Sequence, residues 1–264
     1  MRGRAARRGL RGEAGYSLTE LVVVCALFGM MMAGSLGLYR VAQATYTSTS
    51  GLVDAQSVSR AAIDRMATDL RLAGSFVYGA TSAPNVFTSA STSALTFLGD
   101  VDGDTLTSAG VEATASSAVT TSVVVSSTTG FSVSEYLYVA SGMTREVRQI
   151  SAINTSNNTL TLSASLTSVF VSTSLTPITV RSVESVTWTY DSSAKTLTRQ
   201  VGSATADTIA ADVSSFTLTY YDISNNTTTT ASDIRRIKIS LTTGTGSTKR
   251  SLEVQVQPIS LSLS

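Results

Sequence analysis

The stretch Gly15-Tyr16-Ser17-Leu18-Thr19-Glu20 decides the fold, together with the apolar run from Leu21 to Leu38 that follows it. Glu20 is the only charged residue in the whole stretch. As a helix, residues 16–39 would be about 36 Å long, enough to cross a hydrocarbon core of roughly 30 Å. The sequence therefore predicts a membrane-spanning helix with one carboxylate near its start.

Charge is distributed unevenly along the chain. The net charge is +1, but residues 1–15 carry five arginines and one glutamate, a net charge of +4, which leaves −3 for the rest. A basic segment before an apolar helix marks the cytoplasmic side of a membrane span. This segment has no aromatic residue and adjoins the predicted span. A nucleic-acid patch is therefore the weaker interpretation.

Composition limits the chemistry that the chain can perform. The sequence has no histidine, and its single cysteine, Cys25, lies in the apolar run. Catalysis by Ser-His-Asp or Cys-His groups, most zinc sites and an intramolecular disulfide are thereby excluded. No Gly-rich phosphate loop stands between a strand and a helix. We expect that the protein is not an enzyme and holds no organic cofactor.

Three interpretations of the N-terminal stretch compete. It resembles a cleaved secretory signal, with Ala33-Gly34-Ser35 as the cleavage site, or an uncleaved signal anchor. The third interpretation is a segment that is cut on the cytoplasmic face, before the apolar run. Glu20 favours the third, because a carboxylate at mid-membrane costs about 2.5–3.5 kcal/mol and is of no use to a signal or an anchor.

Cleavage after Gly15 would explain why a carboxylate stands at Glu20. Tyr16 would become a free N-terminus one helical turn from Glu20. In a bundle of such helices, the ammonium group of a neighbouring subunit would neutralise the carboxylate, and the low dielectric would strengthen the pair. The alternative is a glutamate that is merely tolerated at the membrane interface.

This stretch resembles the cleavage and methylation site of type IV prepilins and type II secretion pseudopilins, whose usual pattern is Gly-Phe-Thr-Leu-Ile-Glu-Leu. Matching residues are Gly15, Leu18, Glu20 and Leu21, whereas Tyr16, Ser17 and Thr19 depart from the pattern. The resemblance implies that a prepilin peptidase cuts after Gly15 and methylates the amine of Tyr16. It also implies an assembly role for Glu20.

The helix is predicted to continue as an amphipathic segment over residues 40–74. An apolar stripe recurs at steps of three and four residues, and Gly74 occupies a C-cap position. The stripe consists of Val58, Ala62, Ile63, Met66, Leu70 and Ala73. The charged residues are interpreted as a solvated face: Asp54, Arg60, Asp64, Arg65, Asp69 and Arg71. A bend or local melting is expected at Thr45–Gly51, which is rich in β-branched and small polar residues.

Strand patterns dominate the rest of the chain. Residues 75–118 are predicted to contain a loop and a first strand at Ala94–Leu98. A β-rich insertion is predicted at 119–177, and an antiparallel sheet at 178–264, where apolar and polar residues alternate. The insertion is predicted to contain strands at Val119–Val125, Tyr136–Ala140, Met143–Ile153 and Thr159–Leu162. Trp188 is expected in the core rather than on a ligand platform.

A calcium site is considered at Asp100, Asp102 and Asp104. Aspartates at alternate positions supply the oxygens that Ca²⁺ prefers, but Asp and Gly also suit a tight turn. An EF-hand is disfavoured, because Thr105 stands where its loop needs glycine and Val111 where it needs glutamate. The turn is the preferred interpretation.

The run that ends in Asp69-Leu70-Arg71-Leu72-Ala73-Gly74 resembles PilW-type minor pilins, which are related to J-type minor pseudopilins. The expected fold is α+β, a pilin fold whose long N-terminal helix, transmembrane in its first half, packs on an antiparallel sheet. The resemblance implies residence in the inner membrane with the C-terminal part outside the cytoplasm, and then in a pilus at the cell surface. Its implied partners are prepilin peptidase, other pilins and an inner-membrane assembly platform.

Besides a secreted β-protein with a cleaved signal, two alternatives to a type IV minor pilin stay open. One is a J-type minor pseudopilin of a type II secretion system. The other belongs to a different class: an adhesin or a DNA-binding tip subunit that acts through residues 119–177. Nucleic acid would be a partner only in that last case.

Overall fold

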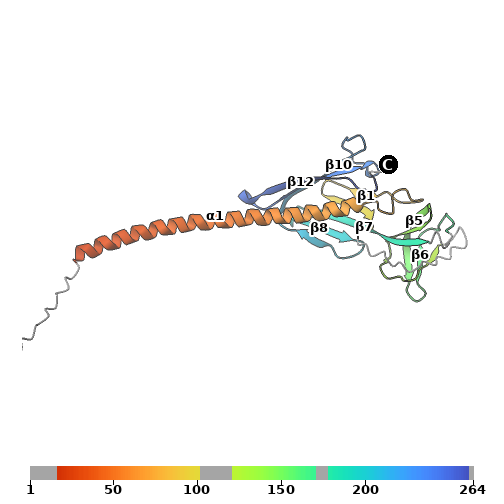
Figure 1. Cartoon of the computed structure of the whole chain (residues 1–264), viewed down its shortest axis with the longest axis horizontal. Coiled ribbons are helices and arrows are strands. Elements are labelled where there is room, and N and C mark those ends of the chain that lie inside the picture. The colour runs from red at the N-terminus through yellow and green to blue at the C-terminus, as the bar shows by residue number, and fades with distance from the viewer. Residues whose placement is uncertain (1–16, 102–120, 171–177, 262–264) are drawn as a thin grey trace, which may run out of the picture. The chain divides into compact units, whose positions relative to one another are not determined.

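The computed structural model describes residues 17–101, 121–170 and 178–261. The chain divides into two compact units, Met1–Ser50 and Gly51–Ser264. Helix α1 (Leu18–Leu72) begins in the first unit and ends in the second, and all the strands belong to the second (Figure 1). The structure is thus α+β, with one long N-terminal helix and antiparallel sheets.

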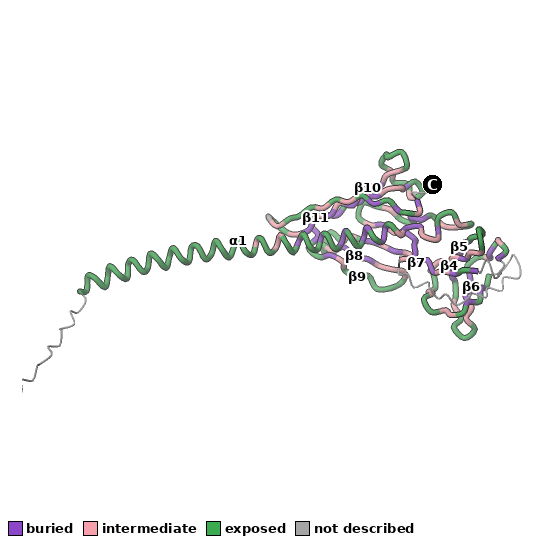
Figure 2. The backbone as a smooth tube through the Cα atoms, in the orientation of Figure 1, coloured by how far each residue is buried: buried purple, intermediate pink, exposed green. Residues whose placement is uncertain are grey.

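In the first unit, the described part of the chain is almost entirely α1. Each residue from Ser17 to Thr47 is exposed (Figure 2). The local melting expected at Thr45–Gly51 does not occur, since this stretch is helical throughout. Thr45 donates its hydroxyl to Val41 O at 2.9 Å, and Thr47 donates to Gln43 O at 3.0 Å. Bonding to the preceding turn satisfies these hydroxyls within the helix.

In the second unit, α1 has a buried face. The predicted stripe is buried from Ala62 onward, whereas Val58 is 37% exposed. Ser59 and Thr243 share a hydrogen bond of 2.5 Å, and Thr243 also donates to Ala55 O, so polar bonds join this face to the sheet. The predicted C-cap is confirmed, because α1 ends at Leu72 and Gly74 has a φ of +77°.

The larger sheet has nine strands, all antiparallel to their neighbours. Its order is β1-β2-β7-β4-β5-β6-β3, with β8 beside β7 and β9 beside β8. The strands are β1 (Phe87–Ala90), β2 (Ala94–Gly99), β3 (Ser122–Val124), β4 (Tyr136–Ser141), β5 (Thr144–Asn154), β6 (Thr159–Leu162), β7 (Thr179–Asp191), β8 (Thr196–Val201) and β9 (Asp207–Ala210). β7 is the longest and pairs with β4 through its first part and with β2 and β8 through its second.

The smaller sheet has three strands in the order β10-β11-β12, again antiparallel. They are β10 (Val213–Tyr221), β11 (Arg236–Thr243) and β12 (Arg250–Val256), with short 3-10 helices η1 (Ala231–Asp233) and η2 (Gly246–Thr248) before β11 and β12. The register places Leu218 opposite Ile239 and Ile239 opposite Val254. Alternate residues therefore form one apolar face, as the sequence predicts.

Two apolar cores lie in the second unit. The first joins α1 to both sheets, and Trp188 is fully buried in it, which confirms the prediction of a core tryptophan. The second core is formed largely by β3–β6, the described strands of the predicted insertion, with Ile178 and Val180 at its border. β4 lies beside β7, so these strands continue the larger sheet.

Tyr220 gives the first core a measurable response to alkaline pH. Its hydroxyl donates to Ser91 O at 2.6 Å, and burial raises its pKa above the ordinary value of 10.0. The folded state therefore keeps a proton that the unfolded chain loses, so the free energy of unfolding falls as the pH rises above about 10. We expect Tyr220→Phe to lose about 1 kcal/mol at neutral pH and to show a shallower alkaline decline.

Urea unfolding between pH 7 and pH 11 measures this difference. Tyr46→Phe is the matched control, because the Tyr46 side chain is 75% exposed. In Tyr46→Phe the free energy of unfolding should fall with rising pH as steeply as it does in the unmodified chain. An alkaline decline in Tyr220→Phe as steep as that of the control would contradict the prediction.

Candidate functional site

The first candidate site is the exposed apolar part of α1. By length and composition, α1 is the one helix among the described residues that is able to cross a membrane. The exposed large apolar side chains of α1 up to Tyr39 are Leu18, Leu21, Val22, Val23, Val24, Leu27, Phe28, Met30, Met31, Met32, Leu36, Leu38 and Tyr39. Such a surface is costly in water, whereas a bilayer or a bundle of similar helices would cover it. This segment is compatible with single-pass anchoring in a membrane.

Glu20 lies in the first turn of α1 and is exposed. Its backbone N–H donates to Ser17 O at 2.9 Å, which starts the helical hydrogen bonding. A carboxylate at this end of a helix is favoured by the helix dipole. Gly15 and Tyr16 lie outside the described residues. The cleavage after Gly15, the methylation of Tyr16 and the pairing of its amine with Glu20 therefore stay predictions.

The calcium candidates are only partly within the described residues. Asp100 is buried, its Oδ2 lies 3.6 Å from Arg181 Nη1, and its backbone N–H donates to Ser75 Oγ. Asp102 and Asp104 lie outside the described residues. Within the described ranges, no three His, Cys, Asp or Glu side chains form a group that could hold a metal ion.

Asp69 corrects the prediction of a solvated charged face on α1. Its side chain is 3% exposed, and Arg199 Nε donates to its Oδ2 at 2.5 Å. Arg199 Nη2 donates to Oδ1 at 3.3 Å, and Trp188 Nε1 donates to Oδ2 at 3.2 Å. A carboxylate with a bidentate arginine and an indole donor has the partners that a buried charge requires. The pair joins α1 to β7 and β8.

The positions of Asp69 and Arg199 relative to their apolar neighbours in the sequence indicate that both side chains are buried. Asp69 follows Met66 by three positions and precedes Ala73 by four, so it belongs to the buried stripe rather than to the opposite face. On β8, Arg199 is two positions after Leu197, and both are buried. Opposite charges on two faces that are both predicted to be buried indicate an internal ion pair.

A second buried ion pair lies in the second core, and the sequence analysis missed it. Glu146 on β5 is fully buried, and Arg148 Nη2 lies 2.5 Å from its Oε1. The carboxylate also accepts hydrogen bonds from the backbone N–H groups of Thr167 and Ser168. Arg148 Nε donates to Ser165 O at 2.9 Å. This pair therefore fixes the segment after β6 against β5.

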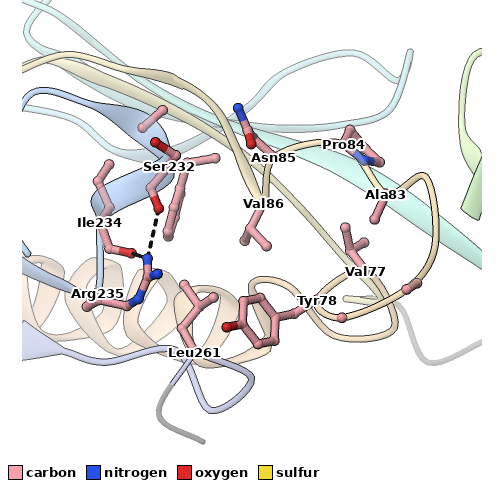
Figure 3. A pocket seen from close by; sticks show the side chains of 14 residues that line it. Val77, Tyr78, Ala83, Pro84, Asn85, Val86, Ser232, Ile234, Arg235 and Leu261 are labelled. Atoms are coloured by element: carbon pink, nitrogen blue, oxygen red, sulfur yellow. Dashed lines mark hydrogen bonds between the residues drawn. The ribbon is translucent and has the colours of Figure 1, made fainter. Parts of the chain in front are cut away.

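A small pocket of about 220 Å³ lies between the segment Val77–Phe87 and the start of β11 (Figure 3). Val86, Ile234 and Leu261 supply apolar walls, and Tyr78 lies near Leu261. Nη1 of Arg235 donates to Ser232 O at 2.8 Å and to Ile234 O at 3.0 Å. Among its described lining residues there is no carboxylate, so they do not provide an acid–base pair.

No protein-family model, no curated protein and no solved structure matches the chain. Of the residues singled out from the sequence, the structure thus places Glu20 on an exposed apolar helix and Asp100 beside Arg181. The buried pair Asp69–Arg199 joins α1 to β8 across 130 residues, whereas Glu146 and Arg148 both lie on β5 and bind the segment that follows β6.

Proposed function

We propose that the chain is a minor pilin of a type IV pilus, acting in the priming of pilus assembly or in the tip complex. The supporting observation is the composition of α1. Its first part is exposed and apolar except for Glu20, and its last part is buried against antiparallel sheets. A subunit that is stored in a membrane and then packed into a filament needs one helix with both properties.

In this proposal the protein first resides in the inner membrane. The arginines of residues 1–15 keep the leader in the cytoplasm, and the sheet-containing unit lies outside it. Prepilin peptidase then cuts after Gly15 and methylates the new amine of Tyr16. The assembly platform transfers the helix from lipid into a bundle of similar helices, where van der Waals packing replaces contacts with lipid.

Glu20 sets the register of the helix in that bundle. A carboxylate in an apolar environment needs a cation, and the described part of α1 has no other charge before Arg40. The amine of Tyr16 from a neighbouring subunit is the cation that cleavage creates. Pairing is possible only when the two helices are offset by about one turn, because the N-terminus and Glu20 are that far apart.

Mass spectrometry of the mature N-terminus tests the proposal. We expect a mature chain that begins with methylated Tyr16. A chain that begins at Ser35 or Leu36 would show that the stretch is a secretory signal, and the proposal would be wrong. Recovery of the protein in sheared surface filaments would distinguish a type IV pilus subunit from a pseudopilin of a type II secretion system.

Glu20→Gln is expected to leave cleavage intact and to abolish incorporation into filaments. The amide keeps the shape of the side chain but does not attract the N-terminal amine. The measurement is the share of processed protein that is recovered with sheared filaments, detected by immunoblot. Asp54→Asn is the control, because Asp54 is an exposed acid on the same helix but lies outside the apolar segment. Normal incorporation of Glu20→Gln would contradict the pairing.

A further inference from the structure

Strand β12 has a free edge. It pairs with β11 along its whole length, from Arg250 to Val256, and the smaller sheet ends there. Among the described residues, β12 makes no backbone hydrogen bond outside this ladder. In an antiparallel strand, alternate residues direct their N–H and C=O groups away from the paired neighbour. β12 therefore presents a row of unpaired donors and acceptors.

The other end strands do not offer such an edge. β1, β3 and β9, which end the larger sheet, have only four, three and four residues. The outer edge of β10 is covered by loops, since Leu218 N donates to Thr92 O and Thr228 N donates to Tyr220 O. Short or covered edges are the usual protection against pairing with another chain. β12, with seven residues, lacks both forms of protection.

A groove of about 320 Å³ lies beside this edge. It is lined by Gln56, Ser59 and Arg60 of α1 and by Arg250, Ser251 and Leu252 of β12. A second hollow continues this groove along α1, because Gln56 and Arg60 line both the groove and the second hollow. Asp64 lines the second hollow, one helical turn beyond Arg60. An extended segment paired with β12 would thus have one side facing α1.

The groove has cations without acidic partners. Arg60 and Arg250, which line it, are exposed, and within the described residues neither of them forms an ion pair. Arg250 lies opposite Thr243, a buried residue that bonds to α1, so it belongs to the face of β12 that is turned to the helix. Against these two cations the lining of both hollows has one acid, Asp64.

We propose that the edge of β12 binds an extended acidic segment of a partner protein. The segment adds a fourth strand to the β10-β11-β12 sheet, and its main-chain bonds to β12 supply the pairing. Every second side chain faces α1, where carboxylates meet Arg60 and Arg250. The side chains between them lie on the solvent face beside Ser251, Glu253 and Gln255, where polar residues fit. This interaction does not depend on the proposed role in a pilus.

Fluorescence anisotropy of labelled peptides, titrated with the full-length chain in detergent micelles, tests the proposal. The probe is an acetylated and amidated peptide of four Thr-Glu repeats, which has strand propensity and an acid at every second position. A peptide of four Thr-Lys repeats tests whether binding requires acidic rather than basic side chains on the peptide. A Thr-Glu peptide with N-methyl groups at alternate positions tests the backbone ladder, because it lacks the donors that pair with β12.

The Thr-Glu peptide is expected to bind, and both other peptides are expected to bind more weakly. Arg60→Glu and Arg250→Glu should each weaken its binding by roughly two- to fivefold, as expected for a partly exposed ion pair. Arg71→Glu is the matched control on the same helix, since Arg71 is exposed and lies outside the groove, and it should leave binding unchanged.

Three outcomes would overturn the proposal. Equal binding or no binding of the Thr-Glu and Thr-Lys peptides would show that the groove does not select acidic segments. Equal binding of the N-methylated peptide would show that β12 does not act as a template. Sedimentation that shows dimers without peptide, abolished by Val254→Pro, would show that the occupant is the β12 strand of a second copy.

Discussion

Arg199→Met is expected to lower the free energy of unfolding of the second unit by about 3–5 kcal/mol. The substitution keeps most of the volume of the side chain but removes the bidentate partner of Asp69, whose remaining cation is Arg65, half exposed and 3.7 Å from Oδ1. Trp188 still donates to Asp69, yet one neutral donor does not compensate a buried charge. Urea unfolding of the full-length chain in detergent measures the loss. Trp188 is the only tryptophan in the sequence, so its fluorescence reports directly on this site.

The double variant Asp69→Asn/Arg199→Met shows whether the loss comes from the unpaired charge. The asparagine still offers an oxygen to Trp188 but carries no charge, so most of the lost stability should return. Buried ion pairs are often replaced by neutral residues at little cost, whereas removal of one partner is strongly destabilising. A double variant that is less stable than Arg199→Met would contradict this explanation. So would a single variant that loses less than about 1 kcal/mol, the usual range of an exposed pair.

Glu146→Ala is expected to destabilise the second core by a similar amount, about 3–5 kcal/mol. Arg148, whose side chain is 10% exposed, would be left without its carboxylate, and the N–H groups of Thr167 and Ser168 would lose their acceptor. Trp188 belongs to the other core and does not report on this site. Hydrogen exchange followed by mass spectrometry is the suitable measurement, because it resolves β4–β6 from the rest of the second unit.

The matched control for this prediction is Glu253→Ala. Glu253 also pairs with a cation, at 2.9 Å from Lys238 Nζ, but its side chain is 56% exposed. The hydrogen bond with Lys238 lowers the pKa of Glu253, yet solvent screens the pair. Exchange in β4–β6 should be unchanged in this control. Protection of Thr167 and Ser168 that survives Glu146→Ala would show that the ion pair does not hold this segment.

The sequence was sufficient to predict elements with a regular pattern. The uninterrupted apolar run and the stripe after it predicted α1, and the strand pattern predicted β6 at its observed bounds. Local patterns suffice here because burial of one face dictates the period of apolar residues. The same reasoning predicted that Trp188 is buried, since it alternates with threonines on β7.

Charged residues whose partners are distant were the ones that the sequence did not place correctly. Asp69 was assigned to the solvated face together with the other charged residues of this segment, because charges are rarely buried unless paired. The partner that makes burial possible, Arg199, is 130 residues away, and no local pattern links the two. Glu146 and Arg148 were missed for a related reason. Their burial depends on Thr167 and Ser168, which contact β5 only in the folded chain.

The distance in sequence between Asp69 and Arg199 also determines when the protein is able to fold. A ribosome completes α1 long before it reaches β8, so when the helix emerges the carboxylate has only the half-exposed Arg65 beside it and lacks its buried arginine partner. Burying it at that stage would leave a poorly compensated charge in an apolar environment. Docking of α1 must therefore wait until most of the chain has been synthesised, and closing so long a loop is slow. During this interval the apolar stripe of residues 62–70 stays uncovered and is a site where a chaperone would be needed.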